Sequence, residues 1–110
     1  MNFALTFINK MTNVYYRGTS DVQLKKELTQ EGLVPYKDKI WLNKEEDINL
    51  AKYYARFKAD GTLRRRGNPV LIKVKVSKEN LGMNGLSGKE AYIVKNNFIP
   101  LEDIISLKYL

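Results

Sequence analysis

Residues 13–20 read Asn-Val-Tyr-Tyr-Arg-Gly-Thr-Ser, a run that leads from a strand directly into a helix. The β-branched and aromatic side chains of residues 13–17 favour a β-strand. Ser20 and Gln23 then make the Ser-x-x-Gln pattern of a capping box, which predicts a helix that ends at Gly32. The order of elements is therefore expected to begin with a strand, a tight turn and a helix.

The remainder of the chain predicts a second helix and several strands. A short strand is expected over residues 39–42, and Asn43 with Glu46 repeats the capping pattern, so that a helix follows and ends at Asp60-Gly61. Residues 72–76 alternate between apolar residues and lysine, which indicates a strand with one buried face. The other expected strands are residues 69–76, 90–94 and 104–110. Gly82, Gly85 and Gly88 punctuate a connection, and residues 100–103 are expected to form a turn or a single helical turn.

The order of these elements predicts an α+β fold. Two helices come early and most strands come late, which favours a largely antiparallel sheet with two main helices. A doubly wound parallel fold would need more crossover helices. The 110 residues suffice for one domain spanning residues 1–110, and a composition of 44% hydrophobic and 28% charged residues is typical of a globular chain.

The residue types that are missing exclude several kinds of chemistry. The sequence contains no cysteine and no histidine, so it has no disulfides, thiolate zinc sites, cysteine nucleophiles or Ser-His triads. Any catalysis must use carboxylates, hydroxyls, Lys, Arg or the backbone, and we expect no metal. No apolar run approaches the roughly 20 residues that span a bilayer, and residues 1–8 lack the pattern of a signal peptide. These features predict a cytoplasmic protein without a membrane partner.

The net charge of +7 is concentrated in one stretch. Residues 56–78 contain eight Lys and Arg against a single Asp, so they account for the whole excess. This concentration predicts an acidic macromolecular partner. Arg64, Arg65 and Arg66 are expected to form an exposed loop that contacts nucleic acid or an acidic protein surface, or that is only solvated. No aromatic residue interrupts them, so binding of single strands by base stacking is not favoured.

Residues 13–110 resemble the small ADP-ribosyltransferase fold. The resemblance is carried by the order of Tyr-Arg-Gly-Thr-Ser at 16–20, Glu-Gly-Leu at 31–33, Ile-Trp-Leu at 40–42, Ala-Lys-Tyr-Tyr-Ala at 51–55, the strand at 69–76, Glu-Ala-Tyr-Ile-Val at 90–94, and Ile99-Pro100 with Ile104. It implies a split sheet and the transfer of ADP-ribose from NAD, as co-substrate, to a host protein or nucleic acid. Small free-standing versions resemble phage-encoded or toxin-like effectors, which would act in the host cytoplasm.

The resemblance assigns NAD binding to the first motif. Arg17 and Gly18 would hold the ribose and the nicotinamide carboxamide, with Thr19 or Ser20 assisting. The residues themselves also suit an anionic nucleotide, because an arginine fork lies beside the free N–H groups of a helix N-terminus. The competing interpretation is that Ser20 only caps the helix and Arg17 is a surface residue. On either view Arg17 is expected near solvent, so that Arg17→Ala would remove NAD binding without unfolding the domain.

The same resemblance assigns aromatic residues to the nicotinamide ring. Trp41 and either Tyr53 or Tyr54 would sandwich it. Neighbouring residues on a helix point about 100° apart, so only one tyrosine can face the pocket, and we favour Tyr54. These residues also suit ordinary packing, with the tyrosines at the core and its rim and Trp41 as the core anchor of a strand.

Arg17 and Glu90 are the catalytic residues that the resemblance implies. A glutamate at the start of a strand would stabilise the oxocarbenium-like transition state as nicotinamide leaves. The chain has Glu-Ala-Tyr-Ile-Val where poly(ADP-ribose) polymerases have Glu-Tyr-Ile-Val, so an ungapped match puts Ala91 in the catalytic place and turns Glu90 to the other face. A bulge beside Gly88 would re-aim Glu90.

Two alternatives to an active ADP-ribosyltransferase stay open from the sequence. An outward Glu90 would instead make the chain a catalytically inactive, basic binding module or inhibitor for nucleic acid or a protein. Action on an RNA 2′-phosphate is a third possibility, which would need more basic residues in the cleft than Arg17.

Overall fold

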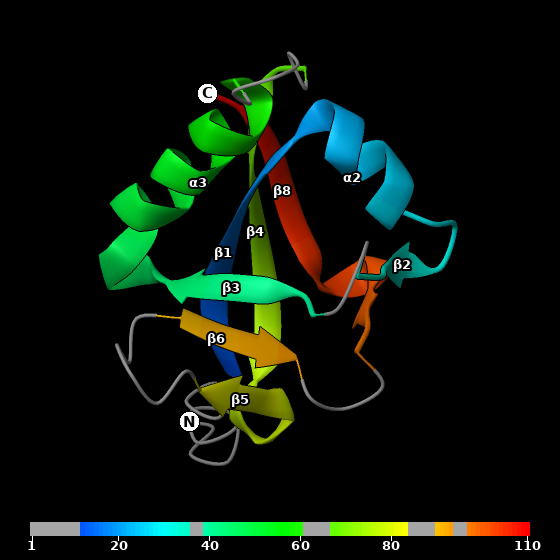
Figure 1. Cartoon of the computed structure of the whole chain (residues 1–110). Helices are drawn as coiled ribbons and strands as arrows, with labels where there is room; N and C mark the ends of the chain where they lie inside the picture. Colours follow the sequence, from blue (N-terminus) through cyan, green and yellow to red (C-terminus); the bar gives the residue numbers. More distant parts are fainter. Residues whose placement is uncertain (1–11, 36–38, 61–66, 84–89, 94–96) are drawn as a thin grey trace, which may run out of the picture.

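The computed structural model describes residues 12–35, 39–60, 67–83, 90–93 and 97–110. These form two α-helices, eight strands and three single 3₁₀ turns (Figure 1). In chain order they are β1 (Thr12–Ser20), α2 (Asp21–Glu27), β2 (Gly32–Leu33), β3 (Trp41–Lys44), η1 (Glu45–Asp47), α3 (Ile48–Asp60), β4 (Pro69–Ser77), η2 (Lys78–Asn80), β5 (Leu81–Met83), β6 (Glu90–Ile93), β7 (Ile99–Pro100), η3 (Leu101–Asp103) and β8 (Ile104–Tyr109). No helix within these ranges is both long and apolar enough to cross a membrane.

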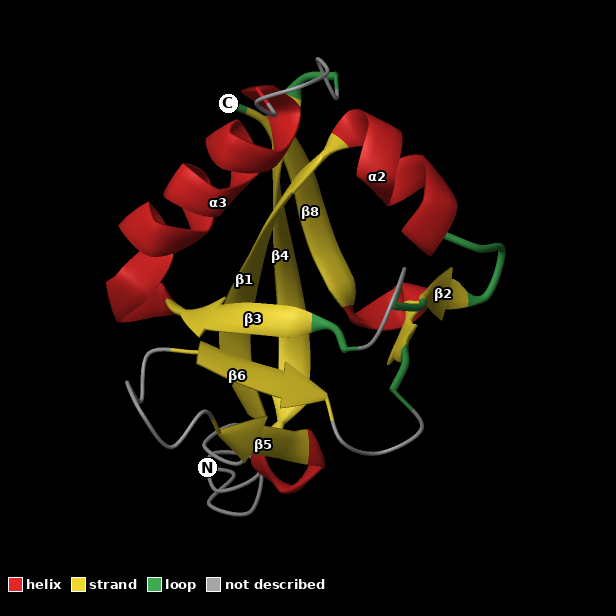
Figure 2. Ribbon diagram, viewed as in Figure 1, coloured by secondary structure: helices red, strands yellow, loops and turns green. Residues whose placement is uncertain are grey.

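The strands form a six-stranded sheet and a small two-stranded one (Figure 2). The large sheet has the order β5-β6-β3-β1-β4-β8, and β2 pairs with β7. Every pairing is antiparallel. The predicted α+β class, with a largely antiparallel sheet and two main helices, is confirmed.

The central strand β1 is paired very unequally on its two sides. With β4 it pairs along its whole length, from Thr12 opposite Ser77 to Ser20 opposite Pro69. With β3 it pairs only where Tyr15 and Tyr16 lie opposite Lys44 and Asn43. From Arg17 onward β1 is therefore paired on the β4 side but not with β3.

The two helices cover opposite faces of the β1–β4 region. The larger core lies on the α2 face, where Tyr15 of β1 and Leu24 of α2 pack with alternate residues of β4. The other face holds a smaller core of Tyr16, Ala51 and Leu71 beneath α3. Residues opposite one another on antiparallel strands share a face, so Arg17 and Thr19 face α2 and Gly18 faces α3.

Most predicted elements are confirmed, and the differences have local causes. Ser20 caps α2 as expected, because its Oγ accepts a hydrogen bond from the Gln23 N–H at 3.1 Å. The prediction that this helix ends at Gly32 is wrong: α2 ends at Glu27, and Leu28 then forms a β-bridge with Leu33.

Asn43 was expected to cap the second helix, and this too is wrong. Asn43 is a buried residue of β3, and α3 is entered through η1 instead. Pairing of Asn43 with Tyr16 in the sheet has overridden a local capping pattern. The glycine-punctuated connection also contains a strand that the sequence did not predict, β5, of which Gly82 is part.

Candidate functional site

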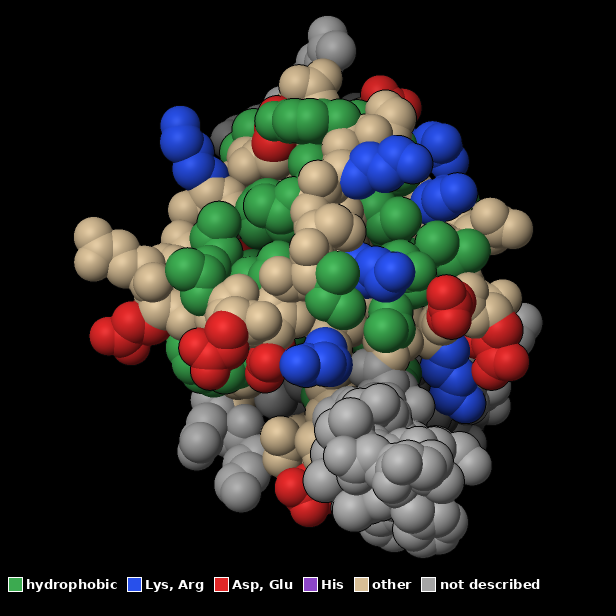
Figure 3. Space-filling model, turned by 180° about the vertical axis from the view of Figure 1, so that it is seen from behind, with side chains coloured by type: hydrophobic (Ala, Val, Ile, Leu, Met, Phe, Trp, Pro, Cys, Tyr) green, Lys and Arg blue, Asp and Glu red, His purple; other side chains and the backbone are tan. Residues whose placement is uncertain are grey.

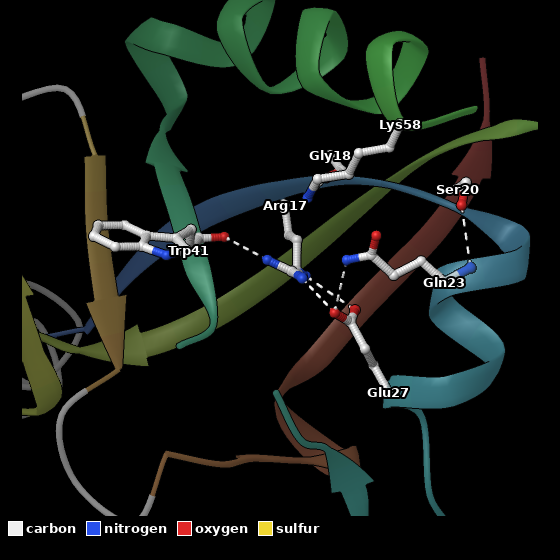
Figure 4. Close-up of polar contacts among 7 residues, drawn as sticks. All are labelled: Arg17, Gly18, Ser20, Gln23, Glu27, Trp41 and Lys58. Carbon is white, nitrogen blue, oxygen red and sulfur yellow. Dashed lines mark hydrogen bonds and ion pairs between the residues drawn. The ribbon is translucent and has the colours of Figure 1, made fainter. Parts of the chain in front are cut away.

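The centre of the candidate site is a buried ion pair between Arg17 of β1 and Glu27 of α2 (Figure 4). The Arg17 Nη2 lies 2.5 Å from the Glu27 Oε2, and Arg17 Nε donates to Oε1 at 3.2 Å, so the contact is bidentate. The Arg17 Nη1 donates a third bond, to the Trp41 carbonyl of β3 at 3.1 Å. Arg17 is only 3% exposed and Glu27 1%. The expectation that Arg17 lies near solvent is therefore wrong.

The Arg17 side chain joins β1 to β3 where the two strands are no longer paired. It reaches the Trp41 carbonyl past the last β1–β3 pair, at Tyr16 and Asn43. Three of the five N–H donors of the guanidinium are used in the bonds to Glu27 and Trp41. At most two of its donors remain for a ligand while Glu27 is in place.

The Glu27 carboxylate is held in position by its own helix. Gln23, one turn earlier on α2, donates from Nε2 to the Glu27 Oε2 at 3.1 Å. The Gln23 backbone N–H in turn bonds the cap Ser20. Ser20, Gln23 and Glu27 thus form a chain of contacts from the helix N-terminus to Arg17, as Figure 4 shows.

Gly18 and Ser20 both have structural roles. A Cβ on Gly18 would lie 1.8 Å from the Ala51 carbonyl oxygen, so Gly18 lets α3 approach β1 closely. Ser20 is 1% exposed and caps α2, as the competing interpretation of this residue held.

Thr19 is the one residue of the first motif with an unsatisfied polar group. Its side chain is fully buried, and Oγ1 has no hydrogen-bond partner among the described residues. Thr19 faces the same side of β1 as Arg17. A buried hydroxyl without a partner is unfavourable, and here it lies beside the ion pair.

Lys58 of α3 adds a second cation to this region. Its Nζ donates to the Gly18 carbonyl at 2.9 Å, so it reaches over the β1 backbone from the α3 side. The pKa of Lys58 is lowered to about 8. Burial is the main cause, the positive charge of Arg17 lowers the pKa as well, and the negative charge of Glu27 partly opposes both effects. Arg17, Glu27 and Lys58 therefore form one electrostatically coupled group.

The lowered pKa of Lys58 predicts a specific pH dependence of stability. Between pH 8 and 10.5 the unfolded chain keeps the lysine proton that the folded protein has lost, so the free energy of unfolding rises with pH in this window. In this pH window the free energy of unfolding of the wild type should rise, relative to that of Lys58→Met, by up to about 1.4 kcal/mol per pH unit. Urea unfolding of both proteins across the window measures this difference.

The control for this measurement is Lys52→Met, the same substitution on the opposite flank of α3. Its stability profile should run parallel to that of the wild type. Parallel profiles for Lys58→Met as well would contradict the assignment of the pH dependence to Lys58.

The aromatic residues of the candidate NAD site are distributed unevenly. Trp41 is 38% exposed, so it is not the core anchor of its strand, and Figure 4 shows its ring directed away from Arg17. Tyr53 is 58% exposed on the outer side of α3, where it stacks on Phe57. Tyr54 is partly buried and lies one turn before Lys58 on the same flank of α3. Of the two tyrosines, Tyr54 is therefore the one that shares a flank of α3 with Lys58.

The strand that carries Glu90 is a neighbour of β3. Glu90 begins β6 and lies opposite Asn43, while Ala91 lies opposite Leu42. The structure describes the backbone of Glu90 but not its side chain. Arg64, Arg65 and Arg66 lie outside the described residues, so the expected basic loop stays a prediction.

Sequence reasoning missed three residues of this site, Gln23, Glu27 and Lys58. One signal was available for Glu27, because it follows the buried Leu24 by three positions and so shares the inward face of α2. A carboxylate at such a position needs a buried partner. Nothing in the local pattern around Lys58 distinguishes it from the surface lysines.

Comparison with known proteins adds no assignment. A scan of the chain against protein-family models gives no match, and a search of curated proteins gives none either.

Proposed function

We propose that this chain is an NAD-dependent ADP-ribosyltransferase that modifies a host protein or nucleic acid. In the reaction the bond between C1′ of the ribose and the nicotinamide nitrogen breaks, and nicotinamide leaves with the bonding electrons. An oxygen or nitrogen of the acceptor then bonds to C1′ and gives up its proton. This chemistry needs electrostatic stabilisation of a cationic transition state and neither histidine nor cysteine.

The observation that carries the proposal is the adjacency of three strands. In the sheet order, β6 with Glu90 lies next to β3 with Trp41, and β3 lies next to β1 with Arg17. These strands are far apart in the sequence, yet the three that carry Arg17, Trp41 and Glu90 are consecutive in the sheet. Pairing between β1 and β3 ends at Tyr16, so the two strands separate at Arg17. We take this separation as the split of the sheet.

In this proposal Arg17 binds the ligand in place of Glu27. The bidentate contact indicates that Arg17 is oriented to receive a pair of oxygens, which phosphate and ribose groups of NAD can supply. A ligand at this position would also reach the unsatisfied Thr19 hydroxyl. Glu90 is proposed to stabilise the oxocarbenium-like transition state from β6.

The Arg17–Glu27 pair also favours a second candidate function. A guanidinium that is already bound to a buried carboxylate is a structural element and needs no ligand. The chain would then be a catalytically inactive, basic binding module for nucleic acid or a protein. The two functions differ in whether NAD binds and is consumed.

The test of activity compares Glu90→Gln with the wild type. We expect the wild type to transfer label from adenylate-labelled NAD to a component of a cell lysate, and nuclease or protease treatment identifies the acceptor class. Glu90→Gln should lower turnover by about 100-fold or more, because one transition-state contact is lost, while NAD affinity by calorimetry changes by only a few-fold.

The matched control is Glu102→Gln, the same change at an exposed glutamate in η3. It should leave both transfer and NAD affinity unchanged. Equal transfer by Glu90→Gln and the wild type would overturn the role of Glu90. A wild type that neither binds NAD nor transfers label would overturn the enzymatic proposal and favour the binding module.

A further inference from the structure

One face of the β4–β8 part of the sheet carries lysines and no carboxylates. Lys73 and Lys75 alternate along β4, and Lys108 of β8 lies opposite Leu71, two residues before Lys73. Because opposite and alternate residues share a face, the three lysines lie on the same side of the sheet, the side covered in part by α3. Neither β4 nor β8 contains Asp or Glu.

The adjacent flank of α3 extends this charge. Lys52 and Arg56 are four residues apart and lie together on the helix surface. Lys58 is six residues after Lys52, on the other flank, where it turns toward Gly18 and Arg17. Lys52 and Arg56 therefore point to the β4–β8 side. Seen from behind, several Lys and Arg side chains lie on the half of the molecule where α3 lies, together with some Asp and Glu side chains (Figure 3).

Five cations on this surface have no ion-pair partner among the residues that the structure describes. We call it the basic face, and it consists of Lys52, Arg56, Lys73, Lys75 and Lys108. Arg56, Lys75 and Lys108 are exposed, and Lys52 and Lys73 are partly exposed. None of the five forms an ion pair with another residue in the part of the chain that the structure describes. Their charge is available to a partner.

We propose that the basic face binds the phosphate backbone of double-stranded nucleic acid. Protein–protein interfaces usually have an apolar or aromatic centre, and here three of the exposed large apolar side chains lie on other surfaces. Tyr53 and Phe57 are on the outer side of α3, and Leu107 lies opposite Ile72, on the α2 face of the sheet. Without aromatic residues on the basic face, single strands have no base-stacking platform, so contact with a duplex backbone fits best.

This inference does not depend on the NAD chemistry and is tested without NAD. The probe is a fluorescently labelled 20-base-pair duplex of arbitrary sequence, as DNA and as RNA, titrated with the full-length chain at several salt concentrations. The wild type is expected to bind with a log K that falls linearly with log[salt]. Each phosphate contact contributes about 0.9 to the slope.

The decisive variant is Lys75→Gln/Lys108→Gln, which removes two exposed charges from the basic face. We expect the slope to decrease by about 2 and the affinity at low salt to fall about tenfold or more. The matched control is Lys25→Gln/Lys26→Gln, which removes two exposed charges from α2. It should change neither the slope nor the affinity by a comparable amount.

Three results would overturn the proposal. One is a wild type that does not bind either duplex at low salt, and another is an equal loss in the α2 control, which would show a response to net charge alone. The third is binding to polyglutamate that is as tight as binding to the duplex, which would assign the basic face to an acidic protein surface. NAD affinity of the Lys75→Gln/Lys108→Gln variant should equal that of the wild type, so failure here leaves the proposed enzymatic function standing.

Discussion

Arg17→Ala is expected to destabilise the protein by about 3–5 kcal/mol, because it leaves the Glu27 carboxylate buried without its partner. It also removes the bond from Arg17 to the Trp41 carbonyl, which joins β1 to β3. Domains of this size are stable by only about 5–15 kcal/mol, so a large part of the stability is lost. Urea unfolding of the variant and the wild type measures the change.

Two further variants separate the buried pair from a general effect of losing an arginine. Arg56→Ala removes an exposed arginine and should change stability by no more than about 0.5 kcal/mol. Arg17→Met/Glu27→Leu removes both charges at once and should recover much of the loss, because apolar residues can replace a buried ion pair at little cost. If Arg17→Ala unfolds at the same urea concentration as Arg56→Ala, the pair has no structural role.

This expectation changes how Arg17 is tested as a ligand residue. The sequence predicted that Arg17→Ala would remove NAD binding and leave the fold intact, whereas the burial of the Arg17–Glu27 pair predicts a considerable loss of stability. Arg17→Lys is the better probe, because it keeps a positive charge beside Glu27 and loses the bidentate geometry. Reduced NAD affinity in a folded Arg17→Lys variant would support the proposed site.

The elements that the sequence predicted correctly depend on local rules. The alternation of apolar residues and lysines over residues 72–76 reflects a strand with one buried face, and β4 has this pattern. The Ser20 cap needs only the backbone of the next three residues. Both signals lie within a few residues, so they can be recognised without knowledge of the tertiary structure.

The elements that the sequence did not predict depend on contacts between distant segments. Asn43 has a capping pattern, but its place opposite Tyr16 and Glu90 in the sheet decides its conformation. Likewise, Glu27 is the buried partner of Arg17, ten residues earlier in the chain, only because α2 folds back beside β1. The neighbours Arg17 and Gly18 look like one ligand-binding motif in the sequence, whereas the structure directs them to opposite faces.

Gly18→Ala is the second substitution with a large expected effect, and it tests the packing role of this glycine. The new Cβ would lie 1.8 Å from the Ala51 carbonyl oxygen and 2.8 Å from the Ala55 nitrogen. Both are backbone atoms, so no side-chain rotation relieves the contact and α3 must move away from β1. We expect a loss of at least about 3 kcal/mol, at the upper end of overpacking effects, since the small core of Tyr16, Ala51 and Leu71 opens as well.

Two measurements on Gly18→Ala distinguish close packing from ligand approach. If Gly18 served only to admit NAD, the variant would lose NAD affinity and keep its urea midpoint, which would contradict the packing role. If α3 is displaced, Lys58 also loses its contact with the Gly18 carbonyl and becomes more exposed. The rise in unfolding free energy above pH 8 that depends on Lys58 should then shrink in Gly18→Ala, because a solvated lysine titrates nearer to its unfolded value. A lower urea midpoint together with this flatter pH profile would place the cause at the contact between β1 and α3.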